Sequence, residues 1–403
     1  MKLLHEIEAF ADRSPGLTEA YDATRPEFTR YAAEVAAWFE QQDPSYESLD
    51  VAIRSTVDPT RSTGLRLALK LAESRRLIAA LEAPVTVTLL NPVYKETGRM
   101  RRRSEHPHGE DSLRTKVGAF RELEELSPHL HARLVVIDDE CPDGSGELAR
   151  TILAEYDDPG RYRVLFLGEA IDRADPDLPP GLTHKDGERR SVKGGSVLFG
   201  MRSSLREPVK GRHILVDNDA DLSVHPAQVG LLIHAIVDGS TQVVAGSRRE
   251  ADSVATIGTT RNTRGRLFIE IWRHFLPQLA ERVQDTNRAF KAFDSAALEA
   301  ILDDIEAYTF PYQIELLQAS VSRGLPLVPR GIAYLDSEAA STQQGEAITE
   351  TYLHQIHQIM DIARRYGTID ADDELLAFFA GMTEDEWARI ESDPPEELSS
   401  LIS

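Results

Sequence analysis

The sequence predicts an α/β protein in which a mainly parallel sheet is flanked by helices. After Pro84 the chain contains short runs of β-branched and aliphatic residues, and helical patterns lie between most of them. Strands that alternate with helices in this way form parallel sheets covered on both faces. The expected strands are VTVTLL (85–90), RLVVID (133–138), YRVLFLG (162–168), HILVDN (213–218) and QVVAG (242–246). The expected helices lie around 112–126, 146–156, 194–205 and 226–238.

Helical regions flank the predicted sheet domain along the chain. Before Pro84, apolar residues recur at helix-face spacing, as at Leu67, Leu71 and Ile78. After about residue 261 the pattern is again mostly helical, and its strand-like runs are 288–293 and 325–335. We therefore expect an N-terminal helical extension over 1–83, a sheet domain over 84–342 and a C-terminal helical tail over 343–403. The N-terminal helices would either pack on the sheet domain or form a homodimer interface.

The composition limits the classes of function. The chain has 403 residues, of which 41% are hydrophobic and 28% charged, enough for a full-sized core. Its formal net charge of −22 argues against a nucleic-acid-binding protein, because phosphate backbones are bound mainly by Lys and Arg. The single cysteine, Cys141, excludes an internal disulfide and a cysteine-based zinc site. The acidic N-terminus and the lack of a long apolar run predict a cytoplasmic protein without an integral membrane segment.

Polar residues follow the first two predicted strands, where parallel sheets bind their ligands. The first strand runs into Pro92, Tyr94 and Glu96, which offer a ring for stacking and a carboxylate for a base or a ribose. The second ends in Asp138 and Asp139, whose carboxylates can accept hydrogen bonds from a nucleobase or from ribose hydroxyls. Taken singly, each is also consistent with an ordinary acidic turn.

The next two strands are followed by residues suited to a diphosphate and a metal. Lys193 precedes two glycines at the start of a predicted helix, where the backbone could approach a phosphate closely. The fourth strand ends in Asp217-Asn218-Asp219-Ala220-Asp221, which places carboxylates two residues apart. Mg²⁺ and Mn²⁺ prefer carboxylates together with substrate oxygens. Such a cation would also bridge an anionic ligand to this acidic protein.

The order of these features resembles the family 2 glycosyltransferases, especially the branch of dolichyl-phosphate glucosyltransferase and dolichol-phosphate mannose synthase. Asp219-Ala220-Asp221 is similar to the family's Asp-x-Asp metal motif, and Asp285-Thr286-Asn287-Arg288-Ala289-Phe290-Lys291-Ala292-Phe293 to its Asp-Thr-Gln-Cys-Gly-Phe-Lys-x-Phe. Four further segments match in the family's order: Asn91–Glu96, Asp138–Ser145, Lys193–Met201 and Phe310–Leu316. The chain departs from these motifs at Lys95, Glu140, Cys141, Ala289 and Gln313.

The resemblance implies a GT-A fold, a Rossmann-like sheet that binds a nucleoside diphosphate-sugar. Within the branch, the closest match over 285–293 favours a UDP-sugar, and UDP-glucose first. The resemblance places uridine or ribose among Pro92, Tyr94, Glu96, Asp138 and Asp139. Asp219 and Asp221 would hold Mg²⁺ or Mn²⁺ beside the donor, and Lys193 or Arg248 would help to stabilise the departing diphosphate.

An acceptor hydroxyl would need a general base, because its pKa lies far above neutral. Asp285 is the candidate by its position in the motif, and Glu315 is the reserve. Two structural roles compete with catalysis, since Asp285 could cap a turn and Glu315 could orient a neighbour. The branch is mostly inverting, so we expect inversion at the anomeric carbon.

The identity of the acceptor is left open. Polyprenol-phosphate transferases of the branch usually carry a membrane segment, so we expect a small soluble acceptor such as a cyclitol, a sugar or a natural product. The alternatives are transfer to a polyprenyl phosphate at a membrane face and a non-catalytic protein that binds nucleotide-sugars. His354 and His357 on a predicted helix either approach the metal or are ordinary exposed residues. A basic insertion is a solvated loop, a lid or a membrane attachment patch: Arg99, Arg101, Arg102, Arg103, His106 and His108.

Overall fold

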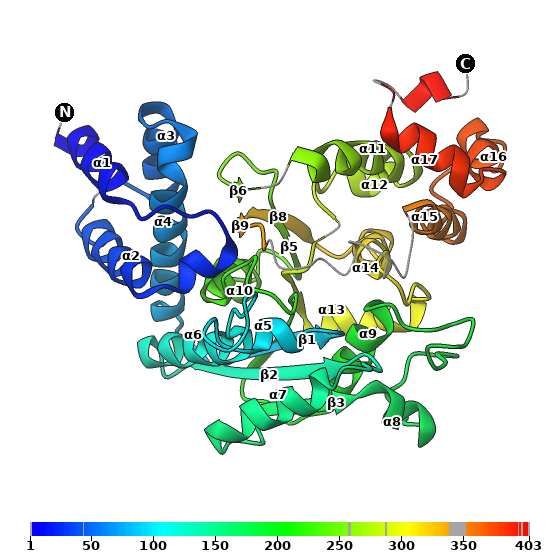
Figure 1. The fold of residues 1–403 in the computed structure, drawn as a ribbon, viewed down its shortest axis with the longest axis horizontal. Coiled ribbons are helices and arrows are strands. Elements are labelled where there is room, and N and C mark those ends of the chain that lie inside the picture. The colour runs from blue at the N-terminus through cyan, green and yellow to red at the C-terminus, as the bar shows by residue number, and fades with distance from the viewer. Residues whose placement is uncertain are drawn as a thin grey trace.

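The computed structural model describes residues 2–42, 44–256, 259–286, 288–337, 352–393, 395 and 398–401. Figure 1 shows a central sheet with its flanking helices between an N-terminal and a C-terminal group of helices. The N-terminal group consists of α1 (Lys2–Arg13), α2 (Pro26–Phe39), α3 (Tyr46–Thr56) and α4 (Pro59–Ala79). The C-terminal group consists of α15 (Tyr352–Tyr366), α16 (Glu374–Ala380) and α17 (Glu384–Ser392). The predicted helical character of both flanks is confirmed.

The central sheet is mainly parallel, as predicted. Its seven strands lie in the order β3-β2-β1-β4-β7-β5-β8, and only β7 runs antiparallel to its neighbours, β4 and β5. The strands are β1 (Val85–Val93), β2 (Leu130–Asp138), β3 (Tyr162–Phe166), β4 (Arg212–Asp217), β5 (Val243–Ser247), β7 (Lys291–Asp294) and β8 (Leu327–Gly331). A separate parallel pair consists of β6 (Val254–Thr256) and β9 (Ala333–Leu335).

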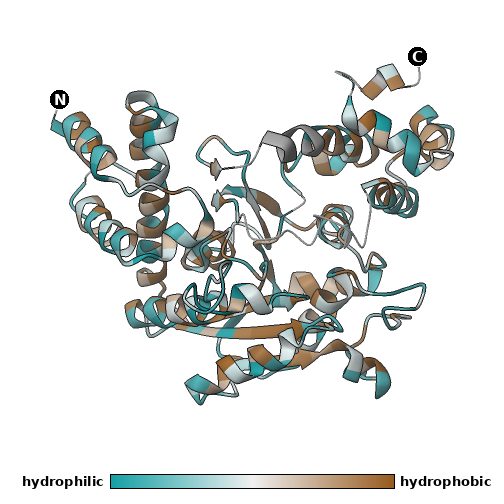
Figure 2. Ribbon diagram, in the orientation of Figure 1, coloured by the Kyte–Doolittle hydropathy of each residue, from teal (hydrophilic) through white to brown (hydrophobic). Residues whose placement is uncertain are grey.

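Helices cover both faces of the sheet, so its central strands are buried on both sides. Val87 and Leu89 of β1 pack with the helices of one face, whereas Leu90 packs with those of the other. Figure 2 shows mainly hydrophobic central strands, whereas the surrounding helices contain both hydrophobic and hydrophilic residues. The first face is covered by α6 (Ser112–Leu126), α7 (Ser145–Leu153) and α10 (Val229–Val237). The second is covered by α8 (Leu167–Asp172), α9 (Gly194–Leu205), α13 (Ser295–Ile301) and α14 (Tyr312–Ser322).

The two flanking groups of helices have different cores. The N-terminal helices form a hydrophobic cluster of their own, which also takes in Leu222, Val254 and Leu335 beyond the sheet. The C-terminal helices join the cluster of the second sheet face, together with α11 (Thr259–Phe275) and α12 (Pro277–Ala280). The division into three units stays a prediction, and its boundary at 342–343 lies outside the described residues. No described helix is both long enough and apolar enough to cross a bilayer.

Candidate functional site

Three neighbouring strands bring predicted ligand-binding segments together at one edge of the sheet. β1, β2 and β4 run parallel, with Val93 opposite Asp138 and Leu90 opposite Asp217. Their carboxyl ends therefore lie side by side, the position at which parallel sheets bind ligands. The segments that follow these strands, 94–96, 139–145 and 218–223, meet at this edge.

Asp217, the last residue of β4, belongs to the core of the protein. It is 1% exposed, and its Oδ2 accepts hydrogen bonds from the Tyr312 hydroxyl at 2.8 Å and from the Gln313 amide at 3.1 Å. Burial raises the pKa of Asp217. Asp217 therefore connects the end of β4 to α14 and is not available to a ligand.

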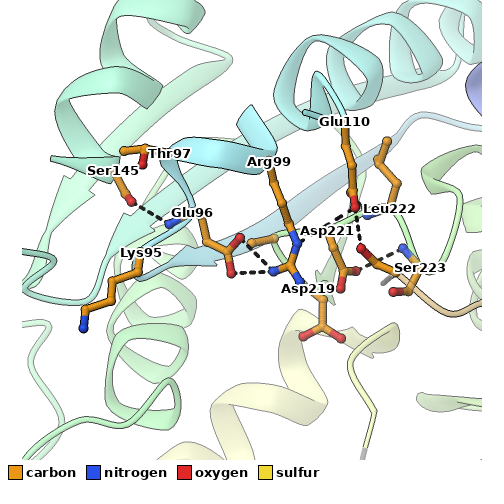
Figure 3. A network of polar contacts seen from close by, with 12 residues as sticks. Lys95, Glu96, Thr97, Arg99, Glu110, Ser145, Asp219, Asp221, Leu222 and Ser223 are labelled. Atoms are coloured by element: carbon orange, nitrogen blue, oxygen red, sulfur yellow. Dashed lines mark hydrogen bonds and ion pairs between the residues drawn. The ribbon is translucent and has the colours of Figure 1, made fainter. Parts of the chain in front are cut away.

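Asp219 and Asp221 are the partly exposed carboxylates of the turn after β4 (Figure 3). Lys193 Nζ forms an ion pair with Asp219 Oδ1, and Asp221 Oδ1 accepts the backbone N–H of Ser223 at 3.0 Å. Burial acts to raise the pKa of Asp219, but the positive charges of Lys193 and Arg288 outweigh it and hold that pKa at about 2. Asp219 is therefore ionised at neutral pH and open to any cation that displaces Lys193.

A buried lysine holds the backbone of this turn. Lys116 on α6 is 0% exposed, and its Nζ donates to the carbonyl oxygens of Asp219 at 2.6 Å and Ala220 at 3.0 Å and to Asn91 Oδ1. Burial lowers the pKa of Lys116 to about 8, because an ammonium group loses its hydration there. The sequence analysis missed Lys116. The available signal was a lysine directly beside the buried Val117 in the apolar stripe of this helix.

The buried carboxylate of Glu110 binds the backbone of Leu222 in the same turn (Figure 3). Glu110, which is 3% exposed, accepts the backbone N–H of Leu222 at 3.1 Å through Oε2 and the Ser337 hydroxyl through Oε1. Arg99 Nε lies 3.9 Å from Glu110 Oε1, and Arg99 Nη1 donates to both carboxylate oxygens of Glu96 at 2.8 Å. Arg99 is therefore a buried part of the site, and the prediction of a solvated loop is wrong for this residue.

Glu96 does not present a free carboxylate to a donor in this arrangement. It is 7% exposed, its carboxylate is bound by Arg99, and its backbone N–H donates to Ser145 Oγ at 2.9 Å. Burial raises the pKa of Glu96 to about 7 against the opposing charge of Arg99. The geometry gives Glu96 a supporting role between α5 (Thr97–Met100) and the turn after β2.

The rest of the basic insertion forms turns between α5 and α6. Arg101 and Arg102 are exposed, whereas Arg103 pairs with Glu19 and lies 4.4 Å from the ring centroid of Tyr21. These contacts tie the insertion to the N-terminal helices. A role as a lid or as an attachment patch stays a prediction.

Asp138 closes the turn that leads from β2 into α7. Its Oδ1 accepts the backbone N–H of Cys141 at 2.9 Å, and its Oδ2 accepts that of Gly146 at 2.8 Å. Burial raises the pKa of Asp138 to about 6. Both oxygens of this predicted donor ligand are therefore engaged by the chain itself.

Asp139 keeps one carboxylate oxygen available. Its Oδ2 accepts from Lys185 Nζ at 2.7 Å and from the backbone N–H of Lys193 at 3.0 Å, whereas its buried Oδ1 has no partner among the described residues. The Lys185 ammonium also lies 4.7 Å from the ring centroid of Tyr94, which is partly exposed, and Pro92 is buried within β1. Tyr94 and Asp139 thus offer a ring face and a hydrogen-bond acceptor to a base.

The start of α9 is closed by another loop of the chain. The Gly195 N–H donates to the carbonyl oxygen of Tyr308 at 2.9 Å, and a Cβ on Gly194 would lie 2.6 Å from the Thr309 carbonyl oxygen. These glycines allow the 308–309 loop, not a ligand, to approach the helix, which corrects the expectation of a phosphate at this backbone. Lys193, with φ of 70°, turns its side chain to Asp219 instead.

Asp285 and Arg248 form a buried bidentate ion pair. The guanidinium donates to Oδ2 at 2.7 Å and to Oδ1 at 2.8 Å, and the Arg248 backbone N–H donates to Oδ2 at 3.0 Å. Burial acts to raise the pKa of Asp285, but Arg248 outweighs it and holds that pKa well below its ordinary value. Such a carboxylate is a weak proton acceptor, so the geometry favours the structural role over the predicted base. The same ion pair occupies the Arg248 guanidinium, which the sequence suggested as a contact for the diphosphate.

Glu315, the reserve base, is buried in a structural contact as well. It is 0% exposed, and its Oε2 accepts the backbone N–H groups of Glu306 at 3.0 Å and Ala307 at 2.6 Å. Its Oε1 lies 2.5 Å from Arg365 on α15. Glu315 therefore orients the 306–307 segment, in line with the competing structural role.

Arg288 is a cation of the site that the sequence analysis did not single out. Arg288 lies just before β7, and its guanidinium is 5.1 Å from the ring centroid of Tyr334. Burial acts to lower its pKa, but the charges around it, including those of Asp219 and Asp285, outweigh burial and raise it. The available signal was an arginine where the related family motif has a cysteine; the adjacent Asn287 lies outside the described residues.

The residues of the turn fit Mg²⁺ or Mn²⁺ if a substrate supplies further oxygens. No group of three or more His, Cys, Asp or Glu side chains placed to hold a metal occurs among the described residues. Mg²⁺ is commonly held by one or two carboxylates together with substrate phosphates and water, and Asp219 and Asp221 can supply those carboxylates.

The two histidines considered as metal ligands, His354 and His357, lie on α15. His357 bonds the carbonyl oxygen of Phe379 at 2.8 Å within the C-terminal helices, and His354 contacts Gln358.

Comparisons with known proteins find glycosyltransferases among the sequence relatives. No family model matches the sequence. Undecaprenyl-phosphate mannosyltransferase of Micrococcus luteus is 27% identical over 220 residues, 53% of this chain and 76% of that protein. Polyprenol monophosphomannose synthase of Mycolicibacterium smegmatis is 27% identical over 230 residues, 55% of this chain and 74% of that protein. Glucosyl-3-phosphoglycerate synthase of Mycobacterium tuberculosis, solved with Mn²⁺ and UDP, has a TM-score of 0.45 and 16% identity, covering 75% of this chain and 85% of that one.

The chain is similar in sequence to glycosyltransferases, as its motifs predicted, and its structure is the predicted α/β fold with a mainly parallel sheet.

Proposed function

We propose that the protein transfers a sugar from a nucleoside diphosphate-sugar, with Mg²⁺ or Mn²⁺ held by Asp219 and Asp221. The observation that carries the proposal is the turn after β4, which presents two accessible carboxylates on a backbone fixed by Lys116 and Glu110. A bound divalent ion supplies Lewis-acid stabilisation of the negative charge that develops on the departing diphosphate. A fixed turn suits that task, because binding geometry has to be maintained as the charge develops.

The donor base would lie between the ends of β1 and β2. The unpartnered Oδ1 of Asp139 can accept a hydrogen bond from a base N–H, and the ring of Tyr94 offers a stacking surface. We propose a UDP-sugar, and UDP-glucose first, from the motif over 285–293. The names of the sequence relatives make mannose the second candidate.

The contacts of the two expected bases, Asp285 and Glu315, bear on the chemical class of the acceptor. Asp285 and Glu315 are both occupied by arginines and backbone N–H groups, so neither is free to take a proton from a hydroxyl. A phosphate monoester is already ionised at neutral pH, with a second pKa of about 6, and can attack without a base. This argument and the names of the relatives favour a polyprenyl phosphate over the small soluble acceptor that the sequence suggested.

A direct comparison of acceptors tests this proposal. The protein would be supplied with Mn²⁺ and either UDP-glucose or GDP-mannose, and offered a polyprenyl phosphate in detergent micelles or a panel of free cyclitols and sugars. We expect a glycosyl-phospholipid product, detected by mass spectrometry, and none with Asp221→Asn. Transfer to a free cyclitol or sugar alone would restore the soluble acceptor. If neither sugar transfer nor donor hydrolysis is detected under any of these conditions, the protein is non-catalytic.

A further inference from the structure

Arg288 is an arginine for which the described residues supply no direct counter-ion. Its Nε is buried without a hydrogen-bond partner, and no described carboxylate forms an ion pair with it within 4.0 Å. Its contact is with the ring of Tyr334, at 5.1 Å from the centroid. A charge that is withdrawn from water without a partner is costly, so such a cation normally has an anionic partner. The guanidinium of Arg288 is therefore able to bind an anion without breaking an existing ion pair with a described residue.

The location of Arg288 indicates which anion it would bind. Lys193 forms an ion pair with Asp219, and Arg288 lies three residues before Lys291, which pairs with Asp217 at the end of β4. A divalent ion on Asp219 and Asp221 would neutralise the carboxylates that now balance these cations. Lys193 and Arg288 would then both require a new anion close to the metal.

We propose that Arg288 binds the diphosphate of the donor, as a second cation beside Lys193. This inference rests on the proposed function and adds a residue whose counterpart in the related motif is a cysteine. Arg248, the arginine expected in this role, is committed to Asp285 by its bidentate ion pair. Charge-assisted, bidentate hydrogen bonds from a guanidinium suit diphosphate oxygens.

Calorimetric titration of UDP in the presence of Mn²⁺ tests this assignment. Arg288→Gln removes the charge, and Arg288→Lys keeps it without the planar guanidinium. Arg121→Gln is the matched control, because Arg121 also lies over a tyrosine ring, that of Tyr156 at 4.9 Å, on the exposed side of α6. We expect Arg288→Gln to weaken UDP binding about 10- to 100-fold, the usual effect of losing hydrogen bonds to a charged group, and Arg288→Lys to weaken it less. Uridine binding, followed by ligand-observed NMR, should be the same in all four proteins.

The outcomes separate this inference from the proposed function. Equal UDP dissociation constants for the wild type and Arg288→Gln would overturn the inference alone. An unchanged UDP affinity with a raised KM for the acceptor would also overturn it and would assign Arg288 to the acceptor. Failure of the wild-type protein to bind UDP, GDP or TDP with Mn²⁺ would overturn both proposals. If Arg288→Gln does not fold, as judged by circular dichroism, the Arg288→Lys titration decides between the same outcomes.

Discussion

The two sides of the turn 219–223 differ in whether they bind the backbone of the turn or its side chains. On the inner side, toward α6 and the 96–110 segment, the carbonyl oxygens of Asp219 and Ala220 are bound by Lys116, and the N–H of Leu222 is bound by Glu110. On the outer side, around Lys193, buried atoms of Asp139 and Arg288 lack partners among the described residues. Asn91 Nδ2 and Ser223 Oγ on the inner side also lack partners among the described residues, so the difference lies in the fixed backbone on one side and in the Lys193–Asp219 ion pair on the other. We infer that the inner side fixes the turn and the outer side receives the ligand.

The largest expected effect comes from a carboxylate of the turn itself. Asp221→Ala should lower turnover at least about 10³-fold, because a lost metal contact removes several kcal/mol of charge stabilisation. The circular dichroism spectrum should not change, since Asp221 is partly exposed. Asp303→Ala is the control, because that aspartate is 86% exposed in its ion pair with Arg202. Near-normal turnover of Asp221→Ala would show that the outer side does not bind the metal in this way.

A pair of buried lysines tests whether the inner side acts on the site. Lys116→Met should weaken Mn²⁺-dependent UDP binding about 10- to 100-fold, as loss of a group that orients metal ligands usually does. Lys70 is also 0% exposed and has three partners, Tyr46, Asp252 and the Gly331 carbonyl oxygen, but it lies in the N-terminal helices. Lys70→Met should lower the free energy of unfolding without changing UDP affinity. Equal affinities in the two variants, measured by calorimetry, would remove the special role of Lys116.

A smaller effect on turnover is expected at Asp285, where the structure favours a supporting role. Asp285→Asn leaves Arg248 buried without its charged partner, so the free energy of unfolding should fall by about 3 kcal/mol. With a polyprenyl phosphate as acceptor, kcat should stay within about tenfold of the wild type, whereas a true base contributes about 10²- to 10⁴-fold. Urea unfolding and steady-state kinetics give the two quantities. A fall in kcat to the larger range at unchanged stability would reinstate Asp285 as the base.

The smallest effect is a change in the pH dependence of stability at Glu96. Burial raises its pKa to about 7 in the folded protein, so its contribution to stability is greatest below its ordinary pKa and is lost as the pH rises through 7. Between pH 5.5 and 8.5 this loss amounts to about 2 kcal/mol. Glu96→Gln has no such titration, so its stability should decline less over this interval than that of the wild type. If urea unfolding showed the same decline in unfolding free energy between pH 5.5 and 8.5 for both proteins, the result would contradict the buried state of Glu96.

Much of the fold could be predicted because the local patterns agree with the tertiary structure. The helix expected at 194–205 is α9 over Gly194–Leu205, and each strand expected in 85–246 is present with small changes at its ends. Helical and strand periodicity carry this information directly. The run expected at 325–335 forms two strands, β8 and β9, which belong to different sheets. Sequence periodicity does not record such a change of partner.

The site could be predicted only where a residue's role depends on its place in a motif. Asp219 and Asp221, the proposed metal ligands, could be selected because both their spacing and their position after a strand are visible in the sequence. Glu96, Asp138 and Asp285 have the expected chemical type, but the structure pairs them with Arg99, backbone N–H groups and Arg248. Lys116 was missed because contacts between distant segments decide its role, and Arg288 because its lack of a direct partner among the described residues shows only in the structure. Spacing along the chain reports a residue's position and does not report its partner.

The central claim is that the turn after β4 binds a nucleoside diphosphate through a divalent cation. Thermal unfolding of the wild-type protein with UDP, in Mn²⁺ and in EDTA, tests it most directly. A ligand that binds only the native state stabilises it by about 2.7 kcal/mol at a hundredfold excess over Kd. The account predicts that UDP raises Tm in Mn²⁺ and leaves it unchanged in EDTA. An equal rise in both would contradict it.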